Sequence, residues 1–460
     1  MIPMTVGEIA DAVRGVCHGV EAATWVTDVV VDSREAVPGA MFVAIAGERA
    51  DGHAFAEEAR ERGACVTLSG RVIDGPCLVV DDPVLALGRL ARWVRTHRLA
   101  CTVVAITGSS GKTSTKDLVA QVLNRSGRTV AAAGSFNTEV GVPLTILRAD
   151  ESTEYLVLEM GMRGEGHIRY LCEIAAPSVG VLINIGSAHL GMLGSVGAIA
   201  RAKGEILEGL PKDGVAIVNG DDVAVMEQAH RTSANVITFG TGPSSDVRAT
   251  DLRLDDRACP AFTLHHGDRA VPVALLLHGE HSVHNALAAA AVGVTLQVPI
   301  EEIASALGAS TPQSRWRMEV RESEEGWIIV NDAYNANPDS MRAALEVLAT
   351  MSANHRSWAV LGEMKELGET AEAEHEAIGR LVCDLGITRL VGIGAGAHPM
   401  ERACQAEGSA ITEATWVATP DEAVTLLRSE LNPGDVVLVK ASRSIGLERL
   451  AAALMSKGQL

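Results

Sequence analysis

The chain has 460 residues, of which 47% are hydrophobic and 21% are charged, and this composition predicts roughly two to four globular domains. Its formal net charge of −19 repels a phosphate backbone and argues against nucleic acid as a partner. No apolar stretch reaches the roughly 18 residues of a membrane helix, and no basic segment precedes an apolar run at the N-terminus. The eight cysteines form no C-x-x-C pair, which indicates buried free thiols rather than a disulfide framework or a zinc site. We therefore expect a cytoplasmic protein without a membrane span or a signal peptide.

Strands and helices alternate along residues 1–100, which predicts a compact first domain. Strands are expected at 25–34, 40–47, 64–69 and 77–82, and helices at 55–62 and 83–98. The second of these helices ends the domain.

Residues 101–311 predict a second domain, whose nearly apolar strands alternate with helices as in a parallel sheet covered on both faces. Strands are expected at 101–108, 155–161, 179–186 and 214–220, and helices from residue 113, at 197–210 and at 282–296. Between residues 246 and 277 the strands follow one another without helices, which predicts an antiparallel patch.

The stretch 308–317, around Pro312, predicts a linker to a third domain at 312–460. Strands at 327–333, 357–363, 389–394, 414–418 and 435–442, each followed by a helix, predict a doubly wound, Rossmann-like unit. The predicted fold class is therefore α/β with three domains, the central one built on a mostly parallel sheet of P-loop type with helices on both faces.

A phosphate-binding loop is predicted in TGSSGKTSTKD, where a strand meets a helix, because its backbone N–H groups and the helix dipole suit phosphate oxygens. Lys112 would place a positive charge on the β- and γ-phosphates of ATP, and Thr113 offers a hydroxyl to Mg²⁺. The usual G-x-x-x-x-G-K-[ST] pattern is shortened, since Ile106 stands in place of its first glycine. The predicted loop residues are Gly108, Ser109, Ser110, Gly111, Lys112, Thr113 and Ser114.

Two candidate metal ligands follow strands of the second domain. Glu159 ends a strand at the edge where α/β sheets place their sites, so we expect it to hold the Mg²⁺ that bridges the nucleotide phosphates. His189 also follows a strand. From the residues alone, a role as a metal ligand and a purely structural role are equally favoured. Lys203, inside a helix, is typical of a solvated surface charge.

The run HGEHSVH places His278, His281 and His284 three residues apart. A spacing of three spreads the rings around a helix and differs from H-E-x-x-H, so we expect no metal cluster here. A helix start that presents His281 and Asn285 to a site is the favoured interpretation.

Polar runs also follow three strands of the third domain. VGIGAGAH fits G-x-G-x-x-[GA] at Gly392, Gly394 and Ala397, which is a weak indication of dinucleotide binding because no clear acid ends the next strand. In NDAYNANPDSM, Asn337-Pro338 predicts a turn with Asp339 or Ser340 as a helix cap, and Asp332, Tyr334 and Asn335 suit a ligand-facing loop. The turn KASRS, with Lys440, suits a carboxylate or phosphate, with surface charge as the alternative.

Taken together, these stretches resemble the Mur ligase family across essentially the whole chain. The resemblance rests on DSR at 32–34, FVAIAGERADGHAF, TGSSGKTSTKD, FNTEVGVP, LEMGM, AHLGMLGS, AKGEI, GEHSVHNALAA, DAYNANP, LGEMKELG and LVKASRS. The shortened loop is shared with folylpolyglutamate synthetases, whereas DAYNANP and GEMKELG favour the family member that adds a dipeptide. The sibling that adds diaminopimelate is expected to carry D-N-P-R, which is absent here.

The resemblance implies an ATP- and Mg²⁺-dependent ligase of peptidoglycan synthesis that joins D-alanyl-D-alanine to UDP-N-acetylmuramoyl-tripeptide, acting as a monomer. Its three domains would bind the UDP-sugar, bind ATP, and close over the site. Ser33 and Arg34 would lie near the uridine diphosphate, and Asn137, Thr138, Tyr334, Asn335 and Asn337 would contact substrate. Asn285 would meet the adenine, and Arg315 and Asp332 the nucleotide. Glu159 and His189 become Mg²⁺ ligands, and Lys203 matches a lysine that carries a metal-binding carbamate in many relatives.

Two departures leave local contacts open: Thr138-Glu139 replaces the more usual Asn-Asp, and Ser314 stands where a glycine is usual before an arginine. Three other functions remain as rivals: a nicotinamide oxidoreductase, a nucleotide-gated binding protein without chemistry, and a folylpolyglutamate-type ligase. The third residue of the tripeptide, lysine or diaminopimelate, is left open.

Overall fold

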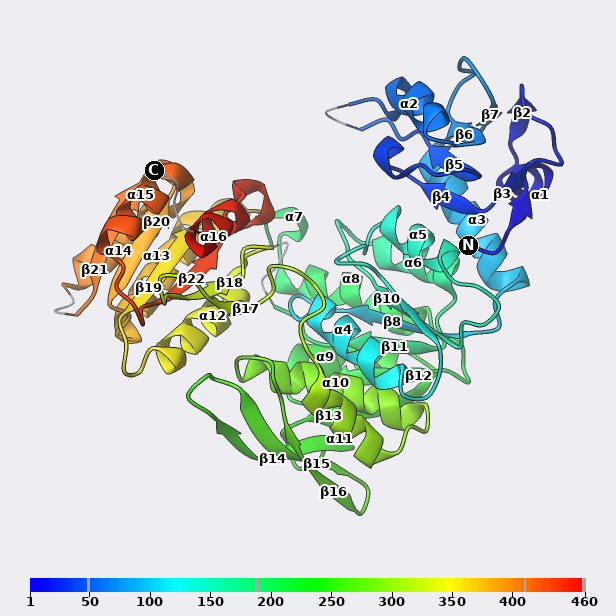
Figure 1. The fold of residues 1–460 in the computed structure, drawn as a ribbon. Helices are drawn as coiled ribbons and strands as arrows, with labels where there is room; N and C mark the ends of the chain where they lie inside the picture. Colours follow the sequence, from blue (N-terminus) through cyan, green and yellow to red (C-terminus); the bar gives the residue numbers. More distant parts are fainter. Residues whose placement is uncertain (48–49, 187–189, 409–410, 457–460) are drawn as a thin grey trace.

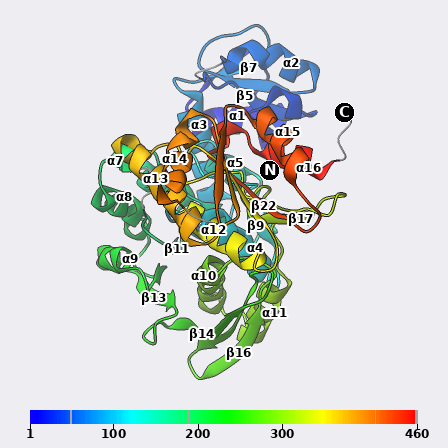
Figure 2. The same ribbon diagram turned by 90° about the vertical axis from the view of Figure 1, so that its left-hand side faces the viewer.

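The structure is a computed structural model, and it describes residues 1–47, 50–186, 190–408 and 411–456. Its strands form three large sheets of five, nine and six strands and one small sheet of two (Figure 1). Each large sheet takes its strands from a separate part of the sequence, so the predicted α/β architecture with three sheets is confirmed. The turned view in Figure 2 keeps the N-terminal part at one end and strands β14 and β16 at the other.

The first sheet has the order β2-β7-β6-β5-β4, with β2 antiparallel to β7 and the other pairs parallel. Its longest helix, α3, begins where Asp82 accepts hydrogen bonds from the backbone N–H groups of Val84 and Leu85. The elements are β1 (Met4–Thr5), α1 (Val6–Val13), β2 (Val16–His18), β3 (Trp25–Val26), β4 (Asp28–Val30), β5 (Ala40–Val43), α2 (Ala56–Glu61), β6 (Val66–Ser69), β7 (Cys77–Val79) and α3 (Pro83–His97).

The nine-stranded sheet has the order β16-β15-β14-β13-β12-β11-β8-β10-β9. Its strands are β8 (Thr102–Thr107), β9 (Thr129–Ala131), β10 (Tyr155–Glu159), β11 (Val179–Leu182), β12 (Val215–Asn219), β13 (Asn235–Gly240), β14 (Val247–Leu254), β15 (Pro260–His266) and β16 (Arg269–Ala274). Its helices are α4 (Lys112–Leu123), α5 (Gly141–Leu147), α6 (His167–Ala175), α7 (Leu190–Leu193), α8 (Val196–Glu208), α9 (Val223–Gln228), α10 (His281–Thr295) and α11 (Ile300–Ala309). The pairs β14–β15 and β15–β16 are antiparallel, as predicted for residues 246–277.

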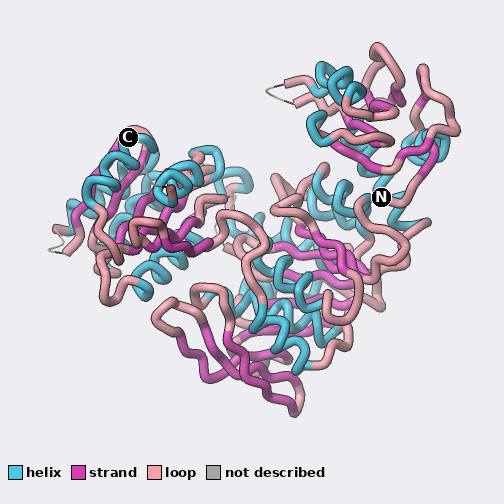
Figure 3. Tube along the Cα trace, in the orientation of Figure 1, coloured by secondary structure: helices cyan, strands magenta, loops and turns pink. Residues whose placement is uncertain are grey.

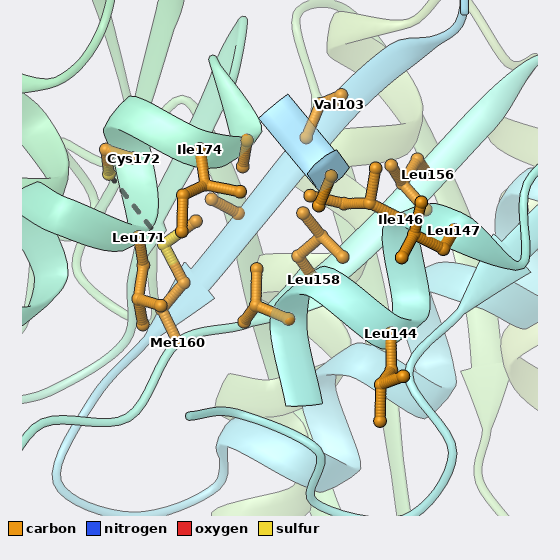
Figure 4. Packing of buried hydrophobic residues seen from close by; sticks show 14 of the residues in the cluster. Val103, Leu144, Ile146, Leu147, Leu156, Leu158, Met160, Leu171, Cys172 and Ile174 are labelled. Carbon is orange, nitrogen blue, oxygen red and sulfur yellow. Dashed lines mark hydrogen bonds between the residues drawn. The ribbon is translucent and has the colours of Figure 1, made fainter. Parts of the chain in front are cut away.

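Both faces of the parallel strands β8, β10, β11 and β12 are buried, which explains why these strands are almost wholly apolar. Val103 of β8 and Leu158 of β10 pack on one face with residues of α5 and α6, such as Ile146 and Leu171 (Figure 4). Val104 and its neighbours on the other face pack against α4 and α10.

The six-stranded sheet has the order β17-β18-β22-β19-β20-β21, parallel except for β17. Helices lie on either side of its strands (Figure 3). The elements are β17 (Glu319–Glu322), β18 (Ile328–Asn331), α12 (Pro338–Met351), β19 (Ser357–Gly362), α13 (Ala371–Asp384), β20 (Arg389–Ile393), α14 (His398–Glu407), β21 (Glu413–Val417), α15 (Pro420–Glu430), β22 (Val436–Lys440) and α16 (Glu448–Met455). The predicted boundaries of the three domains, at about residues 100 and 311, stay predictions.

Three local predictions need comment. The cap of α12 is Asn337, not Asp339 or Ser340, because its side chain accepts from the N–H of Ser340 while the Ser340 hydroxyl accepts from the N–H of Asn337. Cys383 and Cys404, on the neighbouring helices α13 and α14, form a disulfide, whereas we expected only free thiols. Among the described residues, no helix is long and apolar enough to cross a membrane.

Candidate active site

A cavity of about 730 Å³ lies between the central sheet and the third domain. One wall is the predicted phosphate loop, from Ser109 to Ser114, at the carboxyl end of β8. The opposite wall is the polar run after β18, from Asp332 to Asn337. The cavity therefore brings together two motifs that are more than 200 residues apart in the sequence.

The loop itself is supported by Asn184, a residue that the sequence analysis did not identify. The Asn184 carboxamide oxygen accepts hydrogen bonds from the N–H groups of Ser109 and Ser110, at 2.8 and 3.0 Å. Gly111 has a φ of +75°, and a Cβ there would lie 2.4 Å from Oδ1 of Asn285. Only glycine combines this backbone conformation with so close a neighbour, and α4 starts at the next residue.

Two lysines converge on one carbonyl of the loop. Nζ of Lys112 and Nζ of Lys203 each donate to the carbonyl oxygen of Gly108 at 2.9 Å. Burial lowers the pKa of Lys112, partly opposed by the negative charge of Glu159. Burial also lowers the pKa of Lys203 well below the usual lysine value, and the charge of Lys112 adds to that effect. Lys203 is 1% exposed, so its assignment as a solvated surface charge was wrong.

An oxygen-rich cluster faces these lysines. The Thr113 hydroxyl donates to Oε2 of Glu159 at 2.8 Å and lies 2.9 Å from Oγ of Ser135. Nδ2 of Asn137 donates to Oε1 of the same carboxylate at 2.7 Å. Hydroxyl and carboxylate oxygens are the ligands that Mg²⁺ prefers, so the donor set of Thr113 and Glu159 fits this ion. His189 lies outside the described residues.

The third domain contributes a buried ion pair to the cavity. Nζ of Lys440, at the end of β22, lies 2.5 Å from Oδ2 of Asp332 and also donates to the carbonyl oxygen of Asn335 at 2.9 Å. Burial lowers the pKa of Lys440, and the charge of Asp332 opposes that effect. The pair fixes the loop in which Tyr334, Asn335 and Asn337 line the cavity, as predicted for a ligand-facing segment.

Arg317, which the sequence analysis did not single out, reaches from the linker to the phosphate loop, and the contact expected between Arg315 and the nucleotide stays a prediction. Arg315 is exposed and does not line the cavity. Nη2 of Arg317 donates to the hydroxyls of Thr113 and Ser135, each at 3.3 Å, and its guanidinium lies 4.1 Å from the ring centre of Tyr334. Trp316 has a φ of +60°, a region that favours glycine, and this turn points Arg317 inwards.

Of the other predicted site residues, two line the cavity and two lie outside it. Thr138 and Asn285 line the cavity, and Asn285 also accepts from the Thr115 hydroxyl at 3.1 Å. Ser33 and Arg34 lie in the first domain outside the cavity: Ser33 donates to Glu58 at 2.8 Å, and Arg34 lowers the pKa of Asp32 to about 2. Their role towards a uridine diphosphate stays a prediction.

Two of the three histidines of HGEHSVH, His281 and His284, line the cavity, and His278 does not. His284 pairs with Asp221 at 3.1 Å, and His278 lies 2.7 Å from the carbonyl oxygen of Arg257. The described residues contain no group of three or more acidic, histidine or cysteine side chains arranged for a metal ion.

Family models match most of the chain. Residues 106–293 match the Mur ligase middle domain, residues 316–443 the Mur ligase glutamate ligase domain, and residues 26–80 the catalytic domain of the Mur ligase family. The UDP-N-acetylmuramoyl-tripeptide–D-alanyl-D-alanine ligase of Mycobacterium tuberculosis is 44% identical over 99% of this chain and 98% of the relative. The chain belongs to the Mur ligase family.

Solved Mur ligases share the fold over the full length. MurF from Acinetobacter baumannii superposes with a TM-score of 0.88 at 34% identity, covering 99% of both chains. The MurF ligase of Thermotoga maritima in complex with ADP has a TM-score of 0.79 at 31% identity, covering 93% of this chain and 97% of that one. The resemblance expected from the sequence motifs is thereby confirmed.

Proposed function

We propose that this Mur ligase joins the carboxylate of UDP-N-acetylmuramoyl-tripeptide to the amino group of D-alanyl-D-alanine and converts ATP to ADP and phosphate. The observation that carries this proposal is the cavity in which the lysine-bearing loop of the central domain faces the polar run of the third domain. The full-length relatives from Mycobacterium tuberculosis and Escherichia coli, 44% and 36% identical, bear the name of this activity. We place the reaction in the cytoplasm, where ATP is supplied, and expect a monomer.

The phosphate loop supports phosphoryl transfer to the tripeptide carboxylate. A carboxylate is a poor acyl donor because oxide is a poor leaving group, and transfer of the γ-phosphoryl group makes it an acyl phosphate. Lys112 and the loop N–H groups stabilise the negative charge that develops on the transferring group. Arg317 lies beside Thr113 and links closure of the third domain to this centre.

The amide forms in a second step. The amino nitrogen of D-alanyl-D-alanine attacks the acyl carbon, and the tetrahedral intermediate expels phosphate as the C–O bond breaks. The nitrogen loses its proton to the surroundings. Walls from two domains around the cavity keep water away from the acyl phosphate and hold both reactants in place.

A Mg²⁺ ion at this site would neutralise phosphate charge, with Thr113 and Glu159 as its ligands and His189 as a further predicted one. Lys203 would act as the carbamate. Burial and the charge of Lys112 both lower the pKa of Lys203 and so favour its neutral amine, the form that adds to carbon dioxide with loss of a proton. The resulting anion replaces the repulsion between Lys203 and Lys112 with attraction.

The test is phosphate release from ATP and Mg²⁺ with the UDP-tripeptide, with and without D-alanyl-D-alanine. We expect release to require both substrates and to accompany a UDP-pentapeptide identified by mass. ADP formation without the amide product would contradict the proposal. Lys112→Ala is the matched control for release by a contaminating enzyme.

A further inference from the structure

An ion pair lies at the rim of the cavity, outside the phosphoryl-transfer centre. Nη1 of Arg163 is 3.2 Å from Oε1 of Glu139, and both residues line the cavity. Their side chains are 63% and 35% exposed. An exposed pair of this kind contributes only about 0–1 kcal/mol, so a ligand can open it at little cost.

The rim pair is placed by the same two segments that hold Glu159. The side chain of Asn137 donates a hydrogen bond to Glu159. The backbone N–H of Gly161 donates to the carbonyl oxygen of Asn137 at 2.8 Å. Glu139 lies two residues after Asn137, and Arg163 lies two residues after Gly161. Their ion pair is therefore a second contact between the same two segments. The pair therefore lies beside the centre at which the tripeptide carboxylate reacts.

The rim pair also lies on the side of the first domain. Burial raises the pKa of Tyr170, and the charges of Asp82 and Glu139 raise it further, so each of these carboxylates lies near Tyr170. Asp82 caps α3, and a Cβ on Gly88 of the same helix would lie 2.5 Å from the Tyr170 hydroxyl. Tyr170 thus connects this end of the cavity to α3 of the first domain.

We propose that Arg163 and Glu139 bind the far end of the side chain of the tripeptide's third residue, and that this end carries both an ammonium and a carboxylate, as in diaminopimelate. The inference rests on the proposed function. In this proposal the third residue, which bears the reacting carboxylate, has that carboxylate beside Glu159 and its side chain directed towards the rim pair. A zwitterionic end gives each residue of the opened ion pair a new partner. Its carboxylate binds the Arg163 guanidinium in a bidentate contact, and its ammonium pairs with the Glu139 carboxylate.

Lysine at this position satisfies only half of the subsite. Its ammonium pairs with Glu139 but leaves Arg163 without a carboxylate, beside a second positive charge. The rim pair thus discriminates between two side chains that have the same reach and differ by one carboxylate.

The test compares kcat/KM for UDP-tripeptides that end in diaminopimelate or in lysine. We expect the wild-type protein to prefer diaminopimelate and Arg163→Gln to lower the ratio of the two values about tenfold, the loss of one charge-assisted contact. Arg163→Lys keeps the charge without the planar fork and is expected to give an intermediate ratio. Glu139→Gln removes the ammonium partner common to both peptides and is expected to lower both values while changing the ratio less than Arg163→Gln does.

Arg201→Gln is the matched control, because Arg201 forms an exposed ion pair with Glu165 on a neighbouring segment and does not line the cavity. We expect it to leave the ratio unchanged. Equal activity of the wild-type protein on both peptides, or an equal loss on both in Arg163→Gln, overturns the inference while the proposed ligase function stands. Absence of product with either peptide contradicts the proposed function and the inference with it.

Discussion

Two glycine-rich turns follow parallel strands in this molecule, and only one of them lines the cavity. The turn after β8 carries Lys112, and a second lysine, Lys203, reaches its carbonyl oxygen. The turn after β20 fits the dinucleotide pattern at Gly392, Gly394 and Ala397, yet none of these residues lines the cavity. A Cβ at Gly396 would lie 2.3 Å from Cδ of Glu363, so an acidic side chain occupies the space against this turn.

The difference shows that the neighbours of a turn, more than its glycines, decide whether an anion can bind there. Both turns have glycine in a left-handed conformation, with φ of +75° at Gly111 and +81° at Gly394. The first is surrounded by lysines and loop N–H groups, and the second by the Glu363 carboxylate and the indole of Trp416, which donates to Gly394 at 2.8 Å. The geometry therefore gives no support to a nicotinamide oxidoreductase.

The largest effect is expected from removing the charge of the first turn. Lys112→Ala should lower kcat about 10²–10³-fold, because the transferring phosphoryl group loses a preorganised charge in a dry site. Steady-state phosphate release measures this. His398→Ala, at the start of the helix after the second turn, should stay within about twofold of wild type. An equal loss in both variants would contradict the distinction between the turns.

A methyl group added to each turn is expected to impair nucleotide binding at the first turn only. Gly111→Ala and Gly394→Ala each place alanine at positive φ, which costs about 1–3 kcal/mol of unfolding free energy. The cost is larger at Gly394, because its ψ of 167° lies in a region open essentially to glycine alone. Only the first also meets a neighbour, Oδ1 of Asn285 at 2.4 Å, whereas nothing lies within 4 Å of the second. We expect Gly111→Ala to weaken ATP binding about tenfold or more and Gly394→Ala to leave it unchanged. Calorimetric titration with a non-hydrolysable ATP analogue decides between these outcomes.

The buried lysine predicts a pH dependence of stability. The folded pKa of Lys203 lies well below the unfolded value, so between these two values the unfolded chain binds the extra proton. The contribution of Lys203 to stability therefore rises with pH across this window and is greatest above the usual lysine pKa. Lys203→Met should flatten the slope between pH 7 and 9.5 in urea titrations and stabilise the protein at pH 7 by about 1 kcal/mol or more.

The exposed Lys365, paired with Glu363, provides the control for that slope. Lys365→Met should leave it unchanged. A slope that Lys203→Met does not alter would mean that this amine does not titrate abnormally in the folded protein.

The smallest effect is expected in the polar run of the third domain. Asn337→Ala removes the side-chain oxygen that caps α12 and should cost about 1 kcal/mol of unfolding free energy. Thermal unfolding measures this loss. Asn337→Ser keeps a capping oxygen and should restore most of the stability, whereas failure to do so would point to a role outside the cap.

The sequence predicted the features that depend on local pattern. The apolar strands of the central sheet, the helix after Gly111 and the antiparallel strands near residues 246–277 follow from hydrophobic periodicity and turn residues. The phosphate loop was found because its residues are contiguous.

The features that the sequence could not predict depend on distant segments. Asn184 supports the loop only because β11 lies beside β8 in the sheet. Arg315 and Arg317 are two residues apart, and only the left-handed backbone at Trp316 decides which one turns inwards. Lys203 lies at helical spacing from the buried Ile199 and Ile206, which was a missed sign of burial, whereas its contact with the Gly108 carbonyl oxygen depends on the distant loop.

The most direct test of the account is oxygen transfer from the tripeptide to phosphate. A UDP-tripeptide labelled with ¹⁸O at both oxygens of its reacting carboxylate is converted with ATP and D-alanyl-D-alanine, and the phosphate is analysed by mass spectrometry. Passage through an acyl phosphate predicts one ¹⁸O in each phosphate formed. Unlabelled phosphate alongside amide product would contradict phosphoryl transfer to the carboxylate, and with it the role assigned to the loop around Lys112.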